Sequence, residues 1–140
     1  MKDKIILASR SNVRKNILNE NGINCEVVPS NIDEEEVKNS LVKEGASPIV
    51  VSKNLAELKS IKISKKIPDK IVLGADSVID LEGELISKPK NRKEAYLILQ
   101  KLNGKTHNLI SSVCISKNGS MIWNYSDSST LTMKQLNLDE

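Results

Sequence analysis

The chain has 140 residues, of which 39% are hydrophobic and 28% charged, with a formal net charge of +3 and only one Trp, two Tyr and no Phe. This length suits a single domain with a hydrophobic core of Ile, Leu and Val. So few aromatic side chains argue against a protein that binds single-stranded nucleic acid by base stacking. The small positive charge is too weak to indicate a nucleic-acid-binding surface.

The two cysteines, Cys25 and Cys114, each lie within an apolar run typical of a strand. Neither belongs to a CxxC pair or has a histidine at metal-binding spacing, so a zinc site is not expected. Two buried, unpaired thiols are typical of a reducing compartment. No apolar stretch approaches the roughly 18 residues of a transmembrane helix. The first apolar run, of about five residues, is too short for a signal peptide. We therefore expect a cytoplasmic protein that does not enter a membrane.

Residues 4–9 are almost wholly apolar and predict a short central strand. After a polar turn, residues 13–20 have helical periodicity, with Ser11 or Asn12 suited to cap the helix. Free backbone N–H groups and the helix dipole make such a helix start an anion site. Hydroxyl groups and a fork-shaped cation suited to phosphate lie at the same turn: Ser9, Ser11 and Arg14. The alternative is an ordinary capped helix with a solvated arginine, and the spacing alone favours neither interpretation.

Residues 23–29 alternate between apolar and polar side chains, which predicts a half-buried strand. Four consecutive carboxylates, from Asp33 to Glu36, then precede a helix that runs to Glu44. The helix dipole alone explains acidic residues in a first turn. The same cluster suits a divalent cation, because Mg²⁺ takes carboxylates together with substrate phosphates.

Ser47 and Pro48 predict the start of a further helix, which we expect to end near Ile63. Several of its apolar side chains are expected to face the core: Ile49, Val50, Leu55, Leu58 and Ile61. Lysines recur along the same helix at positions 53, 59 and 62. Most of these lysines are expected on the solvated face of the helix, and one of them could point into a functional site.

The stretch from Lys70 to Ile79 is the most informative in the chain. Its β-branched run predicts a buried strand that stops at Gly74 and is followed at once by Asp76 and Ser77. Ligands in α/β sheets bind where strands end at their carboxyl edge. Asp76 is therefore a candidate catalytic base or metal ligand. The competing interpretation is a plain turn, because Gly, Asp and Ser are all common turn residues.

The remaining elements are predicted to be a hairpin over residues 78–86, a helix over 91–104, and a long hairpin of residues 106–116 and 120–133. The first hairpin places Lys88 just before the stiffening Pro89. His107 begins a strand and is assigned no chemistry. The element order, β-α-β-α-α-β-β-β-α-β-β, predicts an α/β domain with a mixed, strongly twisted sheet flanked by helices.

Several nucleotide and hydrolase motifs are missing from the sequence, namely the P-loop, GxGxxG, a nucleophile elbow and a Cys–His pair. What remains is carboxylates, lysines, an arginine and an anion-binding helix start. This combination suits phosphoryl chemistry, in which cations offset phosphate charge while a carboxylate activates water.

An ordered set of short motifs covers residues 5–136: Leu7-Ala-Ser-Arg-Ser11 with Arg14, Ile32-Asp-Glu34, Ala56-Glu-Leu-Lys59, Leu73-Gly-Ala-Asp-Ser77, Lys88-Pro89 and Leu102-Asn-Gly-Lys-Thr-His107. In this the chain resembles the Maf family of nucleoside triphosphate pyrophosphatases. The resemblance implies a Maf/inosine-triphosphatase-like fold. It also implies hydrolysis of a nucleoside triphosphate to the monophosphate and pyrophosphate, assisted by Mg²⁺ or Mn²⁺.

By position, the resemblance makes Asp76 the catalytic aspartate, which deprotonates water or holds the metal. Glu34 shares the metal, and Lys59 and Lys88 face the phosphates. Ser9, Ser11 and Arg14 fall in the loop that grips the triphosphate. The chain departs from the family pattern at Val13, in place of an arginine associated with base selection, and at Ser77, in place of threonine. These two positions put the pyrimidine preference of some members in question.

Relatives of this family continue into a second lobe, whereas this chain stops at Leu138-Asp-Glu140, residues suited to begin another helix. We therefore expect residues 1–140 to form a single Maf-like domain that lacks its C-terminal part. The competing hypothesis is a catalytically impaired nucleotide-binding or cell-division regulatory protein, and a kinase or synthetase is a weaker third. The sequence identifies neither the base nor the metal, and it leaves open whether the chain forms a homodimer.

Overall fold

The computed structural model describes residues 4–9, 11–86 and 89–135, and they form a mixed six-stranded sheet with four helices. The strands are β1 (Ile5–Leu7), β2 (Cys25–Val27), β3 (Val72–Leu81), β4 (Glu84–Ile86), β5 (Thr106–Lys117) and β6 (Ser120–Thr132). The helices are α1 (Asn12–Glu20), α2 (Glu34–Lys43), α3 (Pro48–Lys66) and α4 (Arg92–Leu102). The predicted α/β class with a mixed sheet is confirmed. None of the helices in the described part of the chain has the length and apolar character needed to cross a membrane.

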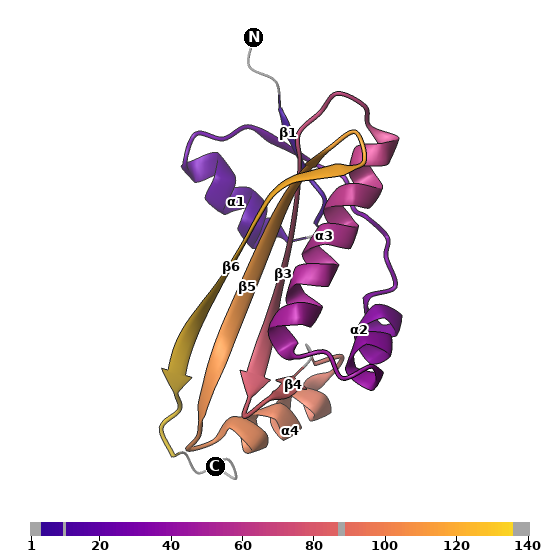
Figure 1. Ribbon diagram of the computed structural model, residues 1–140. Coiled ribbons are helices and arrows are strands. Elements are labelled where there is room, and N and C mark those ends of the chain that lie inside the picture. Colours follow the sequence, from indigo (N-terminus) through magenta and orange to yellow (C-terminus); the bar gives the residue numbers. More distant parts are fainter. Residues whose placement is uncertain (1–3, 10, 87–88, 136–140) are drawn as a thin grey trace.

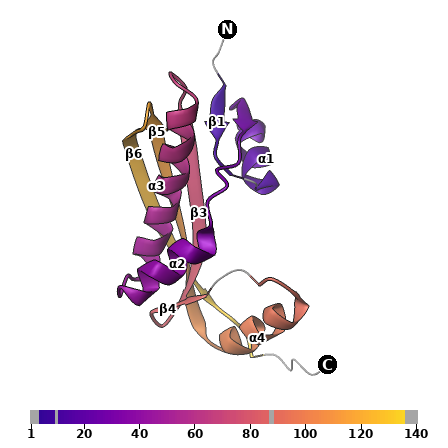
Figure 2. The same cartoon turned by 90° about the vertical axis from the view of Figure 1, so that its right-hand side faces the viewer.

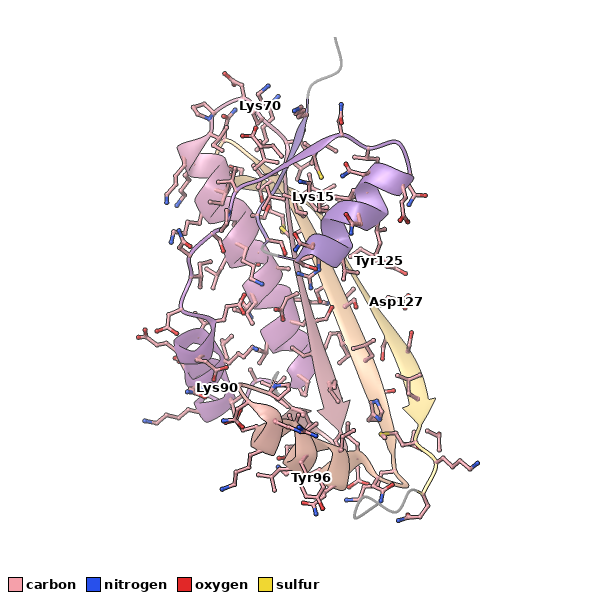
Figure 3. All side chains as sticks on the ribbon, turned by 180° about the vertical axis from the view of Figure 1, so that it is seen from behind. Lys15, Lys70, Lys90, Tyr96, Tyr125 and Asp127 are labelled. Carbon is pink, nitrogen blue, oxygen red and sulfur yellow. The ribbon has the colours of Figure 1, made fainter. Side chains whose placement is uncertain are left out.

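The sheet has the strand order β2-β1-β3-β5-β6, and β4 pairs separately with β3. β1 is parallel to β2 and β3, whereas β3, β4, β5 and β6 pair antiparallel. Figures 1 and 2 show α3 lying along β3 and β5 while α1 lies on the opposite side of the sheet. The molecule is elongated: Lys70, in the loop just before β3, and Tyr96 on α4 lie at opposite ends (Figure 3).

β3 is one continuous strand, so the predicted stop at Gly74 is wrong and the element order has one strand fewer than expected. Gly74 is required for a different reason. A Cβ atom there would clash with the backbone oxygen of Ala56 and would lie 2.8 Å from the nitrogen of Ser60. The glycine therefore allows α3 to pack directly on the strand. As a consequence, Asp76 lies in the middle of β3 and not in a turn.

The buried face of α3 also differs from the prediction. Leu55 is buried as expected, but Ile49, Val50 and Leu58 are exposed. Their place in the interior is taken by smaller side chains, among them three serines that are fully buried: Ser52, Ser60 and Ser64. A close helix–sheet contact favours small residues, and a buried hydroxyl needs a hydrogen-bond partner.

These serines form a polar seam between α3 and the sheet. Ser60 Oγ donates to the carbonyl oxygen of Val72 at 3.0 Å, and Ser52 Oγ lies 3.2 Å from the carbonyl oxygen of Asp76. Ser52 also contacts Ser112 Oγ at 2.8 Å, and Ser112 contacts Ser126 Oγ at the same distance. Hydroxyl groups thus tie the helix directly to β3 and β5, in addition to its apolar contacts, and the Ser112–Ser126 contact extends the seam to β6.

Both predicted hairpin turns are confirmed. Asn118 and Gly119 have φ values of 53° and 82°, and Glu82 and Gly83 have values of 53° and 91°. Such left-handed pairs match the twist of the flanking strands. The two cysteines are free, but only Cys114 is buried, whereas Cys25 is half-buried on the short strand β2.

Candidate functional site

A gap in the pairing of β3 creates the site. β1 pairs with β3 only at Val72 and Leu73, and on the same strand β4 begins to pair at Ile79. Side chains of consecutive strand residues point to opposite faces of a sheet. β1 ends at Leu7, so the edge of β3 between Leu73 and Ile79 has no neighbouring strand on this side in the described part of the chain. Side chains that lie on opposite faces of the sheet can approach one another around this open edge.

The N-terminal loop supplies the cationic side of the site. Ser11 caps α1 as predicted, its Oγ accepting from the backbone N–H of Arg14 at 3.2 Å. Ser9 Oγ accepts from Ser11 N–H at 3.1 Å and from Arg14 Nη1 at 3.0 Å. Arg14 Nη2 lies 3.4 Å from Ser77 Oγ on β3. The arginine is therefore held between the loop and the sheet, with α1 presenting its positive end beside it.

The opposite face of β3 supplies the carboxylate side. Lys59, buried on α3, forms an ion pair with Glu34 and another with Asp76, at 3.4 Å from Asp76 Oδ1. The lysine Nζ also donates to the carbonyl oxygen of Ala75 at 3.2 Å. One ammonium group thus bridges two carboxylates from different elements. It lies where a cation shared by those carboxylates would bind.

Asp76 is only 5% exposed, and burial raises the pKa of its carboxyl group above the ordinary value. The positive charges of Lys59 and Lys38 act in the opposite direction, while Glu34 raises the pKa further. Asp76 Oδ2 is buried and has no hydrogen-bond partner among the described residues. The carboxylate, paired with Lys59 through Oδ1, therefore keeps one oxygen that is desolvated and unbonded.

A cavity of about 510 Å³ joins the two sides, within the usual size range of small-ligand sites. Its wall includes Ser9, Ser11 and Arg14 from the loop and Glu34 and Lys59 from the other side. Asp76 does not line this cavity and lies behind Lys59. The ligand space is polar and bounded by both cations and carboxylates.

Most of the site residues predicted from the sequence come together here: Ser9, Ser11, Arg14, Glu34, Lys59, Asp76 and Ser77. Val13 is 68% exposed on α1 and does not line the cavity. Lys88 lies outside the described residues. Asp33 serves as the N-cap of α2, accepting from Glu36 N–H at 3.1 Å.

Two features escaped the sequence analysis. The loop at Ser30–Ile32 forms part of the cavity wall, although nothing in its composition distinguishes it from an ordinary connection. Lys38 on α2 is buried and close enough to influence Asp76. Its spacing of four residues from Glu34, which places both on one helix face, was the available signal.

The donor set fits a divalent cation such as Mg²⁺. In the described part of the chain no group of three or more His, Cys, Asp or Glu side chains is arranged to hold a metal. Mg²⁺, however, is commonly bound by one or two carboxylates together with substrate phosphates. Two carboxylates are available here: Asp76, whose Oδ2 has no hydrogen-bond partner among the described residues, and Glu34, which shares the ammonium group of Lys59 with Asp76.

Solved structures support the fold. The Ham1 protein of Staphylococcus aureus superposes with a TM-score of 0.61 at 15% identity, covering 93% of this chain and 71% of that one. A nucleoside-triphosphatase, described as a dITP/XTP pyrophosphatase, from Mycobacterium abscessus gives a TM-score of 0.54 at 13% identity, covering 93% and 74%. At these identities the likeness concerns the fold alone.

Sequence comparison is more specific. A nucleoside triphosphate pyrophosphatase of Pelagibacter ubique is 64% identical over 136 residues, which are 97% of this chain and 70% of that protein. A 7-methyl-GTP pyrophosphatase of Brucella abortus is 37% identical over 95% of this chain and 67% of its own length. The family described as Maf-like protein matches residues 4–140. These matches show that the chain belongs to the Maf family.

Proposed function

We propose that the protein is a metal-assisted nucleoside triphosphate pyrophosphatase formed by a single Maf-like domain. It adds water across the bond between the α and β phosphates and releases a nucleoside monophosphate and pyrophosphate. The observation that carries the proposal is the Lys59 bridge between Glu34 and Asp76 at the edge of a cavity that begins at an anion-binding loop. The names of the relatives from Pelagibacter ubique and Brucella abortus support the same reaction class.

The chain's own residues divide the work between the two faces of β3. On one face, Ser9, Ser11 and Arg14 hold the triphosphate, because hydroxyls, a planar guanidinium and free N–H groups at the start of α1 all bind phosphate oxygens. On the other face, Lys59 pairs with Glu34 and Asp76 in the free protein. When the triphosphate binds, its ammonium group is proposed to pair with the phosphate oxygens instead. Lys88, matched to the family's second phosphate lysine, is proposed to add a further cation.

Asp76 is proposed to take the proton of the attacking water or to hold the metal with Glu34. Burial favours the first role, because a carboxyl group with a raised pKa is a stronger base than an exposed one. A bound Mg²⁺ or Mn²⁺ would offset charge on the phosphates and lower the pKa of coordinated water.

The nucleobase preference is proposed to depend on positions 13 and 77. Ser77 contacts Arg14, so its hydroxyl helps to orient the cation that binds the triphosphate. Val13 is exposed beside that arginine and offers an apolar surface in place of a charged one. Cys25 and Cys114 are free thiols, which agrees with a cytoplasmic location.

The test is pyrophosphate release from a panel of standard and modified nucleoside triphosphates with Mg²⁺ or Mn²⁺. Asp76→Ala is expected to abolish turnover, whereas Asp127→Ala, which removes an exposed carboxylate on β6, is expected to leave it unchanged. Turnover of no nucleotide by correctly folded protein would overturn the proposal. Nucleotide-induced thermal stabilisation without turnover would then favour a nucleotide-binding regulatory protein.

A further inference from the structure

The loop between β2 and α2 places a buried serine in the wall of the cavity. Ser30 lines the cavity together with Ser9 and Ser11, yet only 7% of its surface is exposed. Its hydroxyl group makes no hydrogen bond with any other residue in the ranges 4–9, 11–86 and 89–135. A buried hydroxyl group normally has a partner, because burial removes it from water. Since Ser30 borders the cavity, a molecule bound there can supply that partner.

The other two serines of the wall already serve the protein itself. Ser9 Oγ accepts from Arg14 Nη1 and from Ser11 N–H, and Ser11 Oγ accepts from Arg14 N–H. These bonds shape the N-terminal loop and hold the arginine. The hydroxyl group of Ser30 holds nothing comparable in place among the described residues. Its removal would therefore cost the ligand-free protein no hydrogen bond.

The sheet explains how Ser30 reaches the cavity. β1 and β2 are parallel neighbours that end together, with Leu7 opposite Val27. Ser9 lies just beyond the end of β1, and Ser30 lies just beyond the end of β2. Ligands of α/β sheets bind at this carboxyl edge of the strands. The two serines thus enter one cavity from adjacent strands.

The loop that carries Ser30 is held in a defined shape. The next residue, Asn31, has a left-handed φ of 55°, which asparagine adopts more readily than most residues. The carbonyl oxygen of Asn31 lies 3.4 Å from Lys62 Nζ on α3. Ser30 is therefore positioned between the end of β2 and a residue tied to α3. Such pre-organisation lowers the entropic cost of binding a ligand.

We propose that Ser30 is a phosphate-binding residue of the candidate site, whose hydroxyl group donates a hydrogen bond to an oxygen of the triphosphate. The inference rests on the proposed function for the identity of the ligand. Ser30 shares the cavity wall with Arg14 and Lys59, the cations assigned to the phosphates. A hydrogen bond from a hydroxyl group to an anionic oxygen is short and strong. Ser30 adds such a bond from the β2 side of the cavity without adding charge.

The experiment compares Ser30→Ala and Ser30→Cys with Ser40→Ala. Both changes at position 30 remove the hydroxyl group, and cysteine nearly preserves the size of the side chain. Ser40 is an exposed serine on α2 that does not line the cavity, and it serves as the matched control. Calorimetry in the presence of Mg²⁺ measures the binding of inorganic tripolyphosphate. The same measurement is made with α,β-methylene analogues of GTP and UTP, which cannot be cleaved between the α and β phosphates.

Each Ser30 variant is expected to weaken tripolyphosphate binding by roughly 10- to 100-fold, the usual effect of losing one hydrogen bond to a charged group. Binding of the two nucleotide analogues is expected to weaken by the same factor, because the lost bond is to phosphate. Ser40→Ala is expected to leave every affinity unchanged. The melting temperature of ligand-free Ser30→Ala is expected to equal or exceed that of the wild type, since no hydrogen bond within the protein is lost.

Unchanged tripolyphosphate affinity in both Ser30 variants would overturn the inference. A loss confined to the nucleotide analogues would place Ser30 against the nucleoside and would overturn it as well. A clearly lower melting temperature, or failure of both variants to fold, would show that Ser30 is structural and would have the same consequence. These measurements do not depend on turnover. A wild type that binds tripolyphosphate but releases pyrophosphate from no nucleotide would therefore sink the proposed reaction while still deciding the role of Ser30.

Discussion

Replacing Gly74 by alanine tests the helix–sheet contact on which the site depends. Gly74 is the one glycine of the six whose φ lies outside the left-handed region, so an alanine there introduces no backbone strain of its own. The added Cβ would clash with the backbone oxygen of Ala56 and would lie 2.8 Å from Ser60 N and 2.9 Å from Ser60 Cβ. Two of these three contacts involve backbone atoms, which a change of rotamer cannot relieve, so α3 and β3 must separate.

The expected cost follows from these contacts. Overpacking a well-packed interior typically lowers the free energy of unfolding by about 1–3 kcal/mol. Stretching the buried hydrogen bond from Ser60 to Val72 adds about 1 kcal/mol. For a domain of this size, a loss of roughly 3 kcal/mol corresponds to a fall in melting temperature of about 10 °C.

Urea denaturation and thermal melting measure this loss directly. Activity should fall further than stability explains, because Lys59 lies next to Ser60 on α3, and a displacement near 1 Å can cost about 100-fold in rate. Ser129→Ala, on the exposed strand β6, is the control and should leave both quantities unchanged. A Gly74→Ala protein with wild-type stability and activity would refute the close-packing explanation for this glycine.

Two further predictions concern the carboxylates. Because the pKa of Asp76 is raised in the folded protein, its stabilising contribution is complete below the ordinary value of 3.8 and is lost as the pH rises through the folded value. Asp76→Asn should therefore melt at a higher temperature than the wild type in EDTA at neutral pH, with the difference vanishing in acid. An unchanged difference across this pH range would contradict the assignment. Lys59→Met leaves Asp76 buried without its ion pair, and the protein is expected to lose about 3 kcal/mol of stability. Mg²⁺ titrated during melting should stabilise this variant more than the wild type, and equal stabilisation would argue against a metal on these carboxylates.

The elements of the fold were largely predictable because their signals are local. The cap at Ser11, the Asn118–Gly119 turn and the acidic start of α2 each depend on residues within one turn of chain. Which face of a helix is buried was less predictable. The buried side of α3 could not be inferred from apolar periodicity, because serines occupy much of it while Ile49 and Leu58 face solvent.

The candidate site likewise has one part that local sequence predicts and one part that it does not. The grip of Ser9 and Arg14 follows from a strand, a turn and a helix start that are adjacent in sequence. The meeting of Glu34, Lys59 and Asp76 requires α2, α3 and β3 to converge, which no local pattern encodes. Gly74 shows the difficulty most clearly. In sequence it is typical of a turn, and only the neighbouring helix explains it as part of a strand.

The serine hydroxyls between α3 and the sheet fix the position of the helix more than they add to the stability of the protein. Apolar side chains attract without direction, so a helix held by them alone can slide along a strand at little cost. Ser52 and Ser60 instead bond to particular carbonyl groups of β3, those of Asp76 and Val72. A slip of one residue would break both bonds in a dry interior. The seam therefore fixes the position of α3 along β3. It thereby fixes the distance between the ammonium group of Lys59 and the carboxylate of Asp76.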